Sequence, residues 1–161
     1  MVNLPFMQLV DVKRWADREL LEAIEQSRDA LSEQDMDILH RLLDHIHAVD
    51  RIFQHHLEGK AHTYRAPQTE TLPGLCALKS SISEGDDWYA AYVEALPFEA
   101  FDEAVDFTFT SGRPARMSRG QIILHVCLHG TYHRGNAGAL LQLRGLSPGR
   151  DSVADYLQAA A

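Results

Sequence analysis

The amino-acid sequence predicts an all-α fold, a four-helix bundle in a single domain over residues 1–161. Three observations predict it. Long stretches carry apolar side chains at helical spacing, helix-capping residues and loop signals separate these stretches, and no repeat or low-complexity run interrupts them. Hydrophobic residues make up 45% and charged residues 24% of the chain, which is typical of a globular protein with one core.

The first two helices are indicated by apolar periodicity. Residues from about Asp11 to Leu31 form the first, and Ser32 offers an N-cap for the second, which extends from about Glu33 to Gly59. In the second helix the apolar and histidine positions advance by alternating steps of four and three, as in the buried stripe of a bundle. We expect this stripe to consist of Ile38, Leu42, His45, Val49, Ile52 and His56.

A long connection and a third helix follow. Thr63 to Gly74 carries two prolines and several polar residues, which predicts a loop instead of a tight turn between helices. The third helix is expected from about Leu75 to Leu96, although Gly85 lies inside it, and Pro97 ends it. Its candidate core residues are Leu78, Ile82, Trp88, Tyr89 and Val93.

A short β-hairpin is predicted before the last long helix. Apolar and polar residues alternate over 104–117, and Ser111-Gly112-Arg113-Pro114 is a turn sequence. Two strands alone are marginally stable, so the hairpin must pack on the helices. Ser118 then caps a fourth helix from about Arg119 to Arg144, and the tail 151–157 forms a further short turn or helix.

Composition argues against several classes of protein. The formal charge of −8 and the scattered basic residues disfavour binding to nucleic acid, because neutralising phosphates requires clustered Lys and Arg. Cys76 and Cys127 are far apart and lack CxxC spacing, so we expect free thiols. No apolar run is long enough to cross a bilayer, and the segment Met1–Phe6 does not resemble a signal peptide. We therefore expect a cytoplasmic protein without a membrane partner.

The nine histidines are the main functional signal. His129 and His133 are four residues apart, so both imidazoles lie on one face of the fourth helix and can bind one ion. They continue the apolar stripe of Ile122 and Val126 and should point inward, where polar rings need partners. His45 lies on the predicted stripe of the second helix and is the better third ligand, whereas His47 lies on a polar stripe with His40, Asp44, Arg51 and Gln54.

Three imidazoles suit Zn²⁺, Ni²⁺ or Fe²⁺ and leave coordination positions open for water or substrate, as in catalytic metal sites. The alternative is that these histidines are hydrogen-bonded core residues without a metal. Gly130 stands where the HExxH metalloproteases have their glutamate, so that type of peptide hydrolysis is excluded.

Other residues near the pair are weaker candidates. His125 could donate a hydrogen bond to a metal ligand but is more often a partly exposed residue at such a position. Cys127 lies around the helix from His129 and is expected in the core. Asp50 and Tyr132 could orient a water or substrate, but an aspartate at such a position is more often an ion-pair partner. A separate group at the end of the second helix, His55, His56 and His62, is expected to be solvated.

Several stretches together resemble the DinB family. These are His45-Ile46-His47-Ala48-Val49-Asp50-Arg51-Ile52-Phe53, Met117-Ser118-Arg119, and His125 through Asn136 with its HxxxHRG sequence; Asp86-Asp87-Trp88-Tyr89 and Phe107-Thr108-Phe109 extend the likeness over almost the whole chain. The resemblance implies an up-and-down-type, DinB-like four-helix bundle with a long connection. It also implies a metal held by His45, His129 and His133. Asn136 replaces the glutamine of an HRGQ pattern, which puts any ligand-orienting role of that glutamine in doubt.

The resemblance also suggests what the protein does. The family is named for inducibility by DNA damage, which describes expression and not DNA binding, and its wider superfamily includes transferases that use low-molecular-weight thiols. Homodimers are common in it. We therefore expect a metal-dependent S-transferase acting on a small molecule. The alternatives are a metal-dependent hydrolase of a small amide or ester, with the metal activating water, and a non-catalytic metal-binding stress-response protein.

Overall fold

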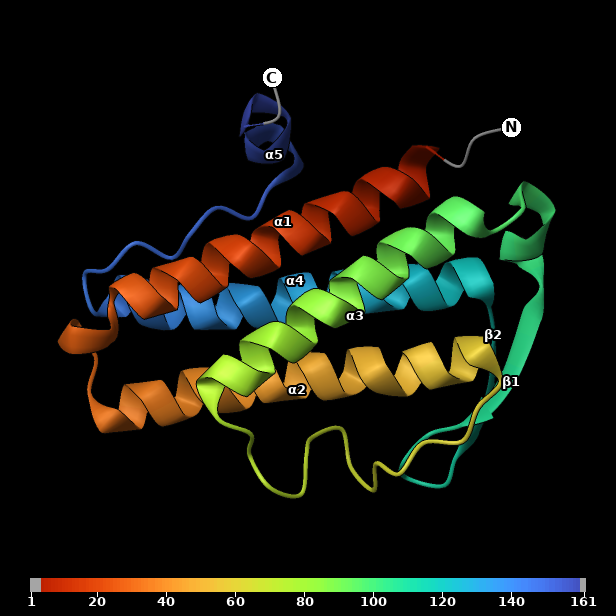
Figure 1. The fold of residues 1–161 in the computed structure, drawn as a ribbon, viewed down its shortest axis with the longest axis horizontal. Helices are drawn as coiled ribbons and strands as arrows, with labels where there is room; N and C mark the ends of the chain where they lie inside the picture. The colour runs from red at the N-terminus through yellow and green to blue at the C-terminus, as the bar shows by residue number, and fades with distance from the viewer. Residues whose placement is uncertain (1–3, 160–161) are drawn as a thin grey trace.

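A computed structural model describes residues 4–159 of the chain. The five residues outside this range include Met1, Val2 and Asn3, on which the expectation about the N-terminal segment partly depended. Four long helices lie side by side (Figure 1): α1 (Leu4–Gln26), α2 (Glu33–Glu58), α3 (Leu75–Ala95) and α4 (Arg119–Leu143). Helix α1 packs against α3 and α4, and α2 packs against the same two helices. The predicted four-helix bundle is therefore confirmed.

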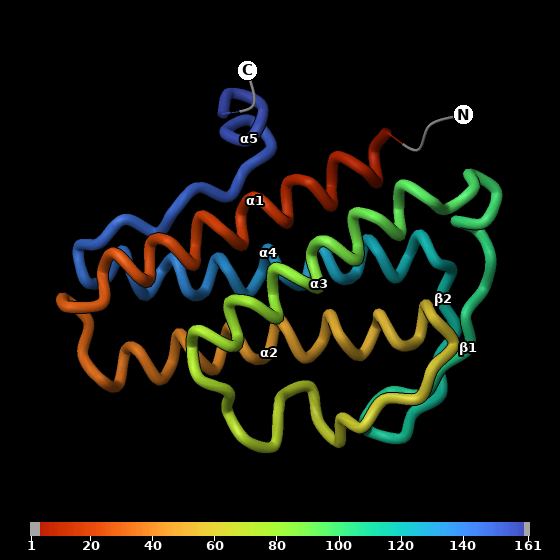
Figure 2. Tube along the Cα trace, in the orientation of Figure 1, coloured from red at the N-terminus to blue at the C-terminus, as the bar shows by residue number. Residues whose placement is uncertain are grey.

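The long connection determines the helix directions. Residues 59–74 run back along the bundle after α2 ends, so that α3 starts near the beginning of α2 and runs parallel to it (Figure 2). Helices α1 and α4 run in the opposite direction. The implied up-and-down order thus holds for α1 and α2 but not for α2 and α3. Asp44 anchors the connection by accepting hydrogen bonds from the backbone N of Thr69 at 3.0 Å and its Oγ1 at 2.8 Å.

Capping residues set most of the helix ends. The Ser32 side chain accepts from the backbone N of Asp35, and Gly59 ends α2 in the left-handed conformation at φ 67°. Ser118 and Gln121 form a capping box at the start of α4. The prediction for α1 was wrong at both ends: Pro5 fits the first turn, where its missing N–H costs nothing, and a 3₁₀ turn at Arg28–Ala30 follows the helix.

The β-hairpin forms as predicted and closes one end of the bundle. Strand β1 (Ala104–Thr108) pairs antiparallel with β2 (Pro114–Ser118), after a 3₁₀ turn at Phe98–Asp102. Gly112 adopts φ 84° in the connecting turn, a conformation that suits glycine. Phe107 is buried and packs edge-on against Phe53 of α2, with 5.5 Å between ring centroids. This contact supplies the support that an isolated hairpin lacks.

A short C-terminal helix, α5 (Val153–Ala159), lies against α1 (Figure 1). Tyr156 meets the ring of Trp15 edge-on at 5.8 Å, and Arg150 forms two hydrogen bonds with the Glu19 carboxylate. This confirms the expected short helix near the C-terminus. None of the described helices is long and apolar enough to cross a membrane.

In the first half of α2 the buried face lies one residue beyond the predicted stripe, whereas Val49 and Ile52 of that stripe are buried as predicted. Ile38 is 40% exposed, whereas Leu39, Leu43 and Ile46 are fully buried. Two adjacent stripes of α2 carry apolar residues, and the positions of α3 and α4 decide which one faces the core. As a result His45 lies at the edge of the core and is half-buried. His47, predicted on a polar face, is instead buried, and burial lowers its pKa to about 4.

Candidate metal centre

The structure brings together the three histidines that the sequence singled out. His45 comes from α2, and His129 and His133 come from successive turns of α4. One ring nitrogen from each lies within 4.8 Å of the others, and all three side chains are partly buried. Ring centroids are 4.9 Å apart for His45 and His129 and 4.5 Å apart for each of the other two pairs. The described residues contain no other group of three His, Cys, Asp or Glu with this geometry.

Hydrogen bonds orient His45 within the triad. Its Nδ1 lies 2.6 Å from the carbonyl oxygen of Pro67, so Nδ1 must carry the hydrogen and donate it. The lone pair of His45 is then on Nε2, which lies 3.1 Å from Nε2 of His129. A backbone carbonyl that orients one ring nitrogen while the other faces inward is the usual arrangement around metal-binding histidines.

Two further ring nitrogens have no hydrogen-bond partner although they are buried, Nδ1 of His129 and Nδ1 of His133. Leaving a buried polar atom unpaired costs stability, and such atoms in a native structure are frequently explained by an ion or a water. The lone pair of His45 that faces Nε2 of His129, together with the third imidazole, gives a donor set that fits a first-row divalent metal.

The surroundings of His129 and His133 favour the neutral form of both rings. Burial lowers the pKa of His129 to about 3, and the neighbouring rings of His133 and His45 add to the effect. Burial and His45 also lower the pKa of His133. A metal ion binds the neutral imidazole, so these histidines need not lose a proton at neutral pH before they can act as ligands.

A pocket of about 320 Å³ opens beside the triad and is lined by two of its members, His45 and His129. Its walls are mostly apolar and come from α2, Pro67, the hairpin turn and α4. A larger cavity of about 610 Å³ lies elsewhere, between α1 and α3. It borders the exposed Cys76 and the ion pair of Glu25 with Lys79, but it has no converging set of metal-binding groups. The chemistry therefore points to the smaller pocket.

The three residues near the histidine pair that were weaker candidates for the site, His125, Tyr132 and Cys127, differ in their surroundings. His125 is half-buried in the pocket wall, 4.7 Å from the ring of Phe53 and 5.6 Å from that of His129. Tyr132 is 68% exposed and points away from the core. Cys127 is a core residue as expected, and burial raises the pKa of its thiol to about 12, so it remains protonated at neutral pH.

The second histidine group was predicted wrongly. His55, His56 and His62 are partly buried because the chain after α2 folds back over them. The ring of His56 stacks on Phe107 at 4.6 Å and lies 5.1 Å from that of His62, and burial lowers the pKa of His56 to about 4. These histidines thus join the packing between α2 and the hairpin.

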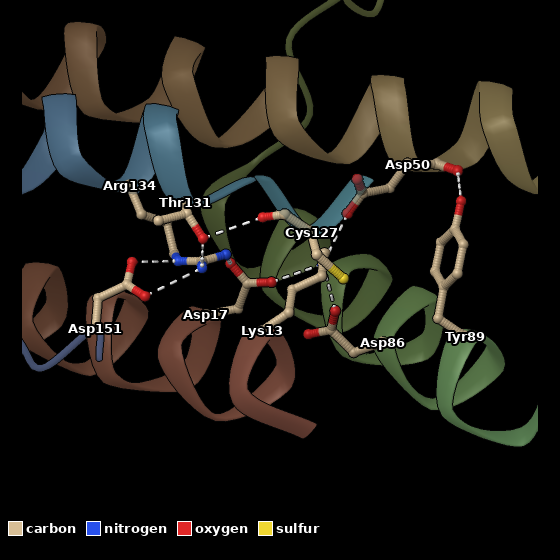
Figure 3. Close-up of polar contacts among 9 residues, drawn as sticks. All are labelled: Lys13, Asp17, Asp50, Asp86, Tyr89, Cys127, Thr131, Arg134 and Asp151. Carbon is tan, nitrogen blue, oxygen red and sulfur yellow. Dashed lines mark hydrogen bonds and ion pairs between the residues drawn. The ribbon is translucent and has the colours of Figure 1, made fainter. Parts of the chain in front are cut away.

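A buried ionic network connects the four long helices and was not predicted from the sequence (Figure 3). Lys13 of α1 is 2% exposed, and its ammonium nitrogen contacts carboxylate oxygens of Asp17 at 2.8 Å, Asp50 at 2.8 Å and Asp86 at 2.6 Å. Asp50 is thus an ion-pair partner between helices. Tyr89 donates from its hydroxyl to the backbone oxygen of Asp50 at 2.7 Å, which adds a tie between α3 and α2.

Arg134 connects this network to the histidine pair. It follows His133 directly, is buried, and donates to Asp17 at 3.0 Å and to Asp151 at 2.8 and 3.2 Å. Its Nη2 also donates to the Thr131 hydroxyl at 3.1 Å. The middle of α4 is therefore held against α1 and the C-terminal segment. Asn136, which replaces the glutamine of the HRGQ pattern, is exposed, and its side chain forms no hydrogen bond with the residues that the structure describes.

The network has a pattern in the sequence that could have revealed it. Each long helix has a charged residue on the buried face between two apolar residues: Lys13 and Asp17 between Val10 and Leu20, Asp50 between Ile46 and Phe53, Asp86 between Ile82 and Tyr89, and Arg134 between Cys127 and Ala137. A basic residue on a buried face requires acidic partners nearby, and Lys13 finds them on its own helix and on two others.

A histidine triad at the edge of a four-helix bundle with a hairpin before the last helix defines a bundle that could bind a metal ion. The sequence model of the DinB family matches residues 1–161, the whole chain. The chain therefore belongs to the DinB family. A search among curated proteins found no match.

Proposed function

We propose that His45, His129 and His133 bind one divalent ion, Zn²⁺, Ni²⁺ or Fe²⁺, in a metal-dependent enzyme that transfers a small thiol. The observation that carries the proposal is the convergence of three ring nitrogens within 4.8 Å at the edge of a pocket. Three protein ligands leave positions open on the side that faces the pocket. When bound, the metal would lower the pKa of a small thiol and hold it as the nucleophilic thiolate.

The residues around the triad support this chemistry. His45 is oriented by Pro67, and the middle of α4 is held by Arg134, so the ligand positions are prearranged. Apolar walls of Val49, Ile52 and Phe53 keep water away from the reacting group. Cys127 is buried and protonated, so the reacting thiol comes from a separate molecule.

The alternatives have less support. A hydrolase needs a base near the attacking water, and since no Asp or Glu is among the described residues that line the pocket, His125 is left for that role. A protein that only sequesters metal would be expected to close the coordination shell, whereas this triad borders an open pocket. A thiol transferase requires only the metal, the pocket and a neutral set of ligands.

Metal content tests the proposal directly. Untagged wild-type protein should carry close to one divalent ion per chain by plasma mass spectrometry, and a variant with His45→Ala, His129→Ala and His133→Ala should carry none. A matched control replaces three other histidines, His40, His55 and His62, by alanine and should retain the ion. Equal metal in all three proteins would refute the ligand assignment, and no metal in the reconstituted wild type would refute the proposed function. Thiol binding is then tested by the absorption of the cobalt-substituted protein.

The proposed enzyme is a homodimer, as expected from the resemblance. An exposed apolar stripe on α4 favours this assembly: Leu124 is 38%, Leu128 62% and Tyr132 68% exposed, at steps of four residues. Sedimentation equilibrium should give twice the mass of the chain. A Leu128→Glu variant that sediments like wild type would exclude this stripe as the contact.

A further inference from the structure

The pocket beside the triad has an apolar body. Val49, Ile52 and Phe53 of α2 line one side and are each less than a tenth exposed, and Phe109 lines the side formed by the hairpin. Such walls favour the hydrocarbon part of a ligand, because removing apolar surface from water is favourable on both sides of the contact. The triad rings His45 and His129 supply polar groups at one part of the pocket wall.

The pocket wall includes one positively charged side chain, that of Arg113, among the residues that the structure describes. Arg113 follows Gly112 in the hairpin turn, and the centre of its guanidinium lies 4.9 Å from the centroid of the Phe109 ring. The backbone N of Phe109 donates to the carbonyl oxygen of Arg113 at 2.9 Å, which ties the two residues together. A guanidinium stacked on an aromatic face keeps its N–H groups free at its edge.

The charge of Arg113 is not neutralised within the described part of the chain. The other two arginines nearby have carboxylate partners: Arg116 contacts Asp106 at 3.0 Å, and Arg119 contacts Glu103 at 3.0 Å. Among residues 4–159, Arg113 has no ion pair, and no acidic residue lines the pocket with it. Arg113 is exposed in the hairpin turn, so water solvates its guanidinium until a ligand replaces that water, and a cation beside apolar walls attracts a ligand that carries an anionic group.

We propose that the pocket takes a small organic molecule with an apolar body and a carboxylate, and that Arg113 is the residue that selects the carboxylate. The proposal rests on the proposed function, which it deepens. The small thiol would be a molecule that also carries a carboxylate, with its sulfur toward the histidines and its carboxylate toward the hairpin turn. The planar guanidinium offers two parallel N–H donors that match the two oxygens of a carboxylate. A neutral analogue of the same size loses this contact but keeps the apolar one.

Matched acid and amide probes test this selectivity. Zinc-loaded protein is titrated by calorimetry with mercaptopropionate and mercaptohexanoate, each beside its primary amide. For whichever chain length reaches Arg113, wild type should bind the acid about three- to tenfold more tightly than the amide, as expected for a charge-assisted hydrogen bond at a partly solvated site. Equal binding of acid and amide at both lengths would overturn the proposal.

Two variants isolate the contribution of Arg113. Arg113→Met removes the charge but keeps apolar contact with Phe109, and it should bring the acid-to-amide ratio close to one without changing the affinity for the amide. Arg116→Met changes the net charge of the protein by the same amount and should keep the wild-type ratio. A preference for the acid that survives in Arg113→Met, or that disappears equally in Arg116→Met, would contradict a local role for Arg113.

The same samples separate this proposal from the proposed function. Zinc titration should give equal metal affinity for wild type and Arg113→Met, because Arg113 is not in the triad. If wild type binds no zinc, the proposed thiol chemistry fails. The acid-to-amide ratio is then measured on metal-free protein by ligand-observed NMR, where both probes bind more weakly and the ratio is expected to remain. A ratio of one in the metal-free protein would then refute the carboxylate pocket as well.

Discussion

At the scale of single residues, Lys13 has the largest expected effect on stability. Lys13→Met would leave the carboxylates of Asp17, Asp50 and Asp86 buried without their shared cation. Removing one partner of a buried ion pair typically costs about 3–5 kcal/mol. We expect a loss of this size in the free energy of unfolding from urea denaturation. Lys79→Met, which breaks an exposed ion pair with Glu25, is the control and should cost less than about 1 kcal/mol.

Two glycines of α4 provide a second comparison at this scale. A Cβ on Gly130 would lie 2.9 Å from Nη1 of Arg134, whose guanidinium is held by carboxylates and cannot easily move. Gly130→Ala should therefore destabilise the protein by about 1–3 kcal/mol. Gly135→Ala meets nothing within 4 Å and should stabilise it by up to about 1 kcal/mol, since alanine favours helix. Thermal unfolding measures both, and shifts of equal sign would contradict the packing described for Gly130.

The convergence of the three histidines, unlike the residues around them, could be predicted from the sequence. His129 and His133 are close on any helix, because four residues make about one turn. His45 required a choice of helix face, and that choice was only approximately right, since His45 borders the core instead of lying in its stripe. Lys13 and Arg113 were missed because the environment of each depends on contacts between distant segments, which residue spacing within one helix does not report.

At the scale of elements, the cap of α4 joins the hairpin to the helix that carries two triad members. Ser118 ends β2, and its side chain accepts from the backbone N of Gln121 at 3.2 Å. Ser118→Ala should cost about 1 kcal/mol, as is typical for the loss of an N-cap. Hydrogen exchange should also quicken at the first turn of α4. Ser80→Ala, at an exposed position in the second turn of α3, is the control, and equal losses of stability in both variants would mean that the cap contributes nothing specific.

Element boundaries followed the capping chemistry wherever it was present. Ser32, Gly59 and Ser118 mark ends that agree with the structure, because each satisfies backbone groups that the helix leaves unpaired. Helix α1 starts before the predicted position because a proline in the first turn leaves no hydrogen bond unmade, so Pro5 is compatible with a helix start. The parallel course of α2 and α3 could not be derived, since a connection of this length permits either direction.

At the scale of the whole molecule, the ionic network divides the core along the bundle axis. One apolar cluster, including Phe53, Tyr89 and Ile122, lies toward the hairpin, and another, including Ile24, Leu39 and Leu141, lies toward the turn between α1 and α2. Charged groups at the same level on four helices disfavour any alternative packing that leaves one of them unpaired. The network thus fixes how far each helix is shifted along its neighbours, and with it the approach of His45 to the pair on α4.

The network also makes stability depend on pH. Burial raises the pKa of Asp86 to about 7 and that of Asp50 to about 6. The folded protein therefore holds protons on these groups that the unfolded chain has released, and the resulting stabilisation is lost as the pH rises through these values. Burial acts oppositely on His47, whose pKa falls from 6.5 to about 4, so its contribution is lost as the pH falls below 6.5. The two effects oppose each other between about pH 4 and pH 6.5, so the contribution of one group is measured only against a variant that lacks it.

Asp86→Asn isolates the carboxyl part of this dependence, because asparagine cannot ionise. Between about pH 4 and pH 7 the folded wild type holds a proton on Asp86 that the unfolded chain has released, so its stability falls as the pH rises, whereas the variant has no such proton. The free energy of unfolding of the variant relative to wild type should therefore rise with pH, whatever the constant cost of the lost contact with Lys13. Asp87→Asn, which alters an exposed neighbour paired with Arg14, should give a curve parallel to wild type. Urea denaturation at each pH measures the three curves, and a parallel curve for Asp86→Asn would show that Asp86 is ionised in the folded protein throughout this range.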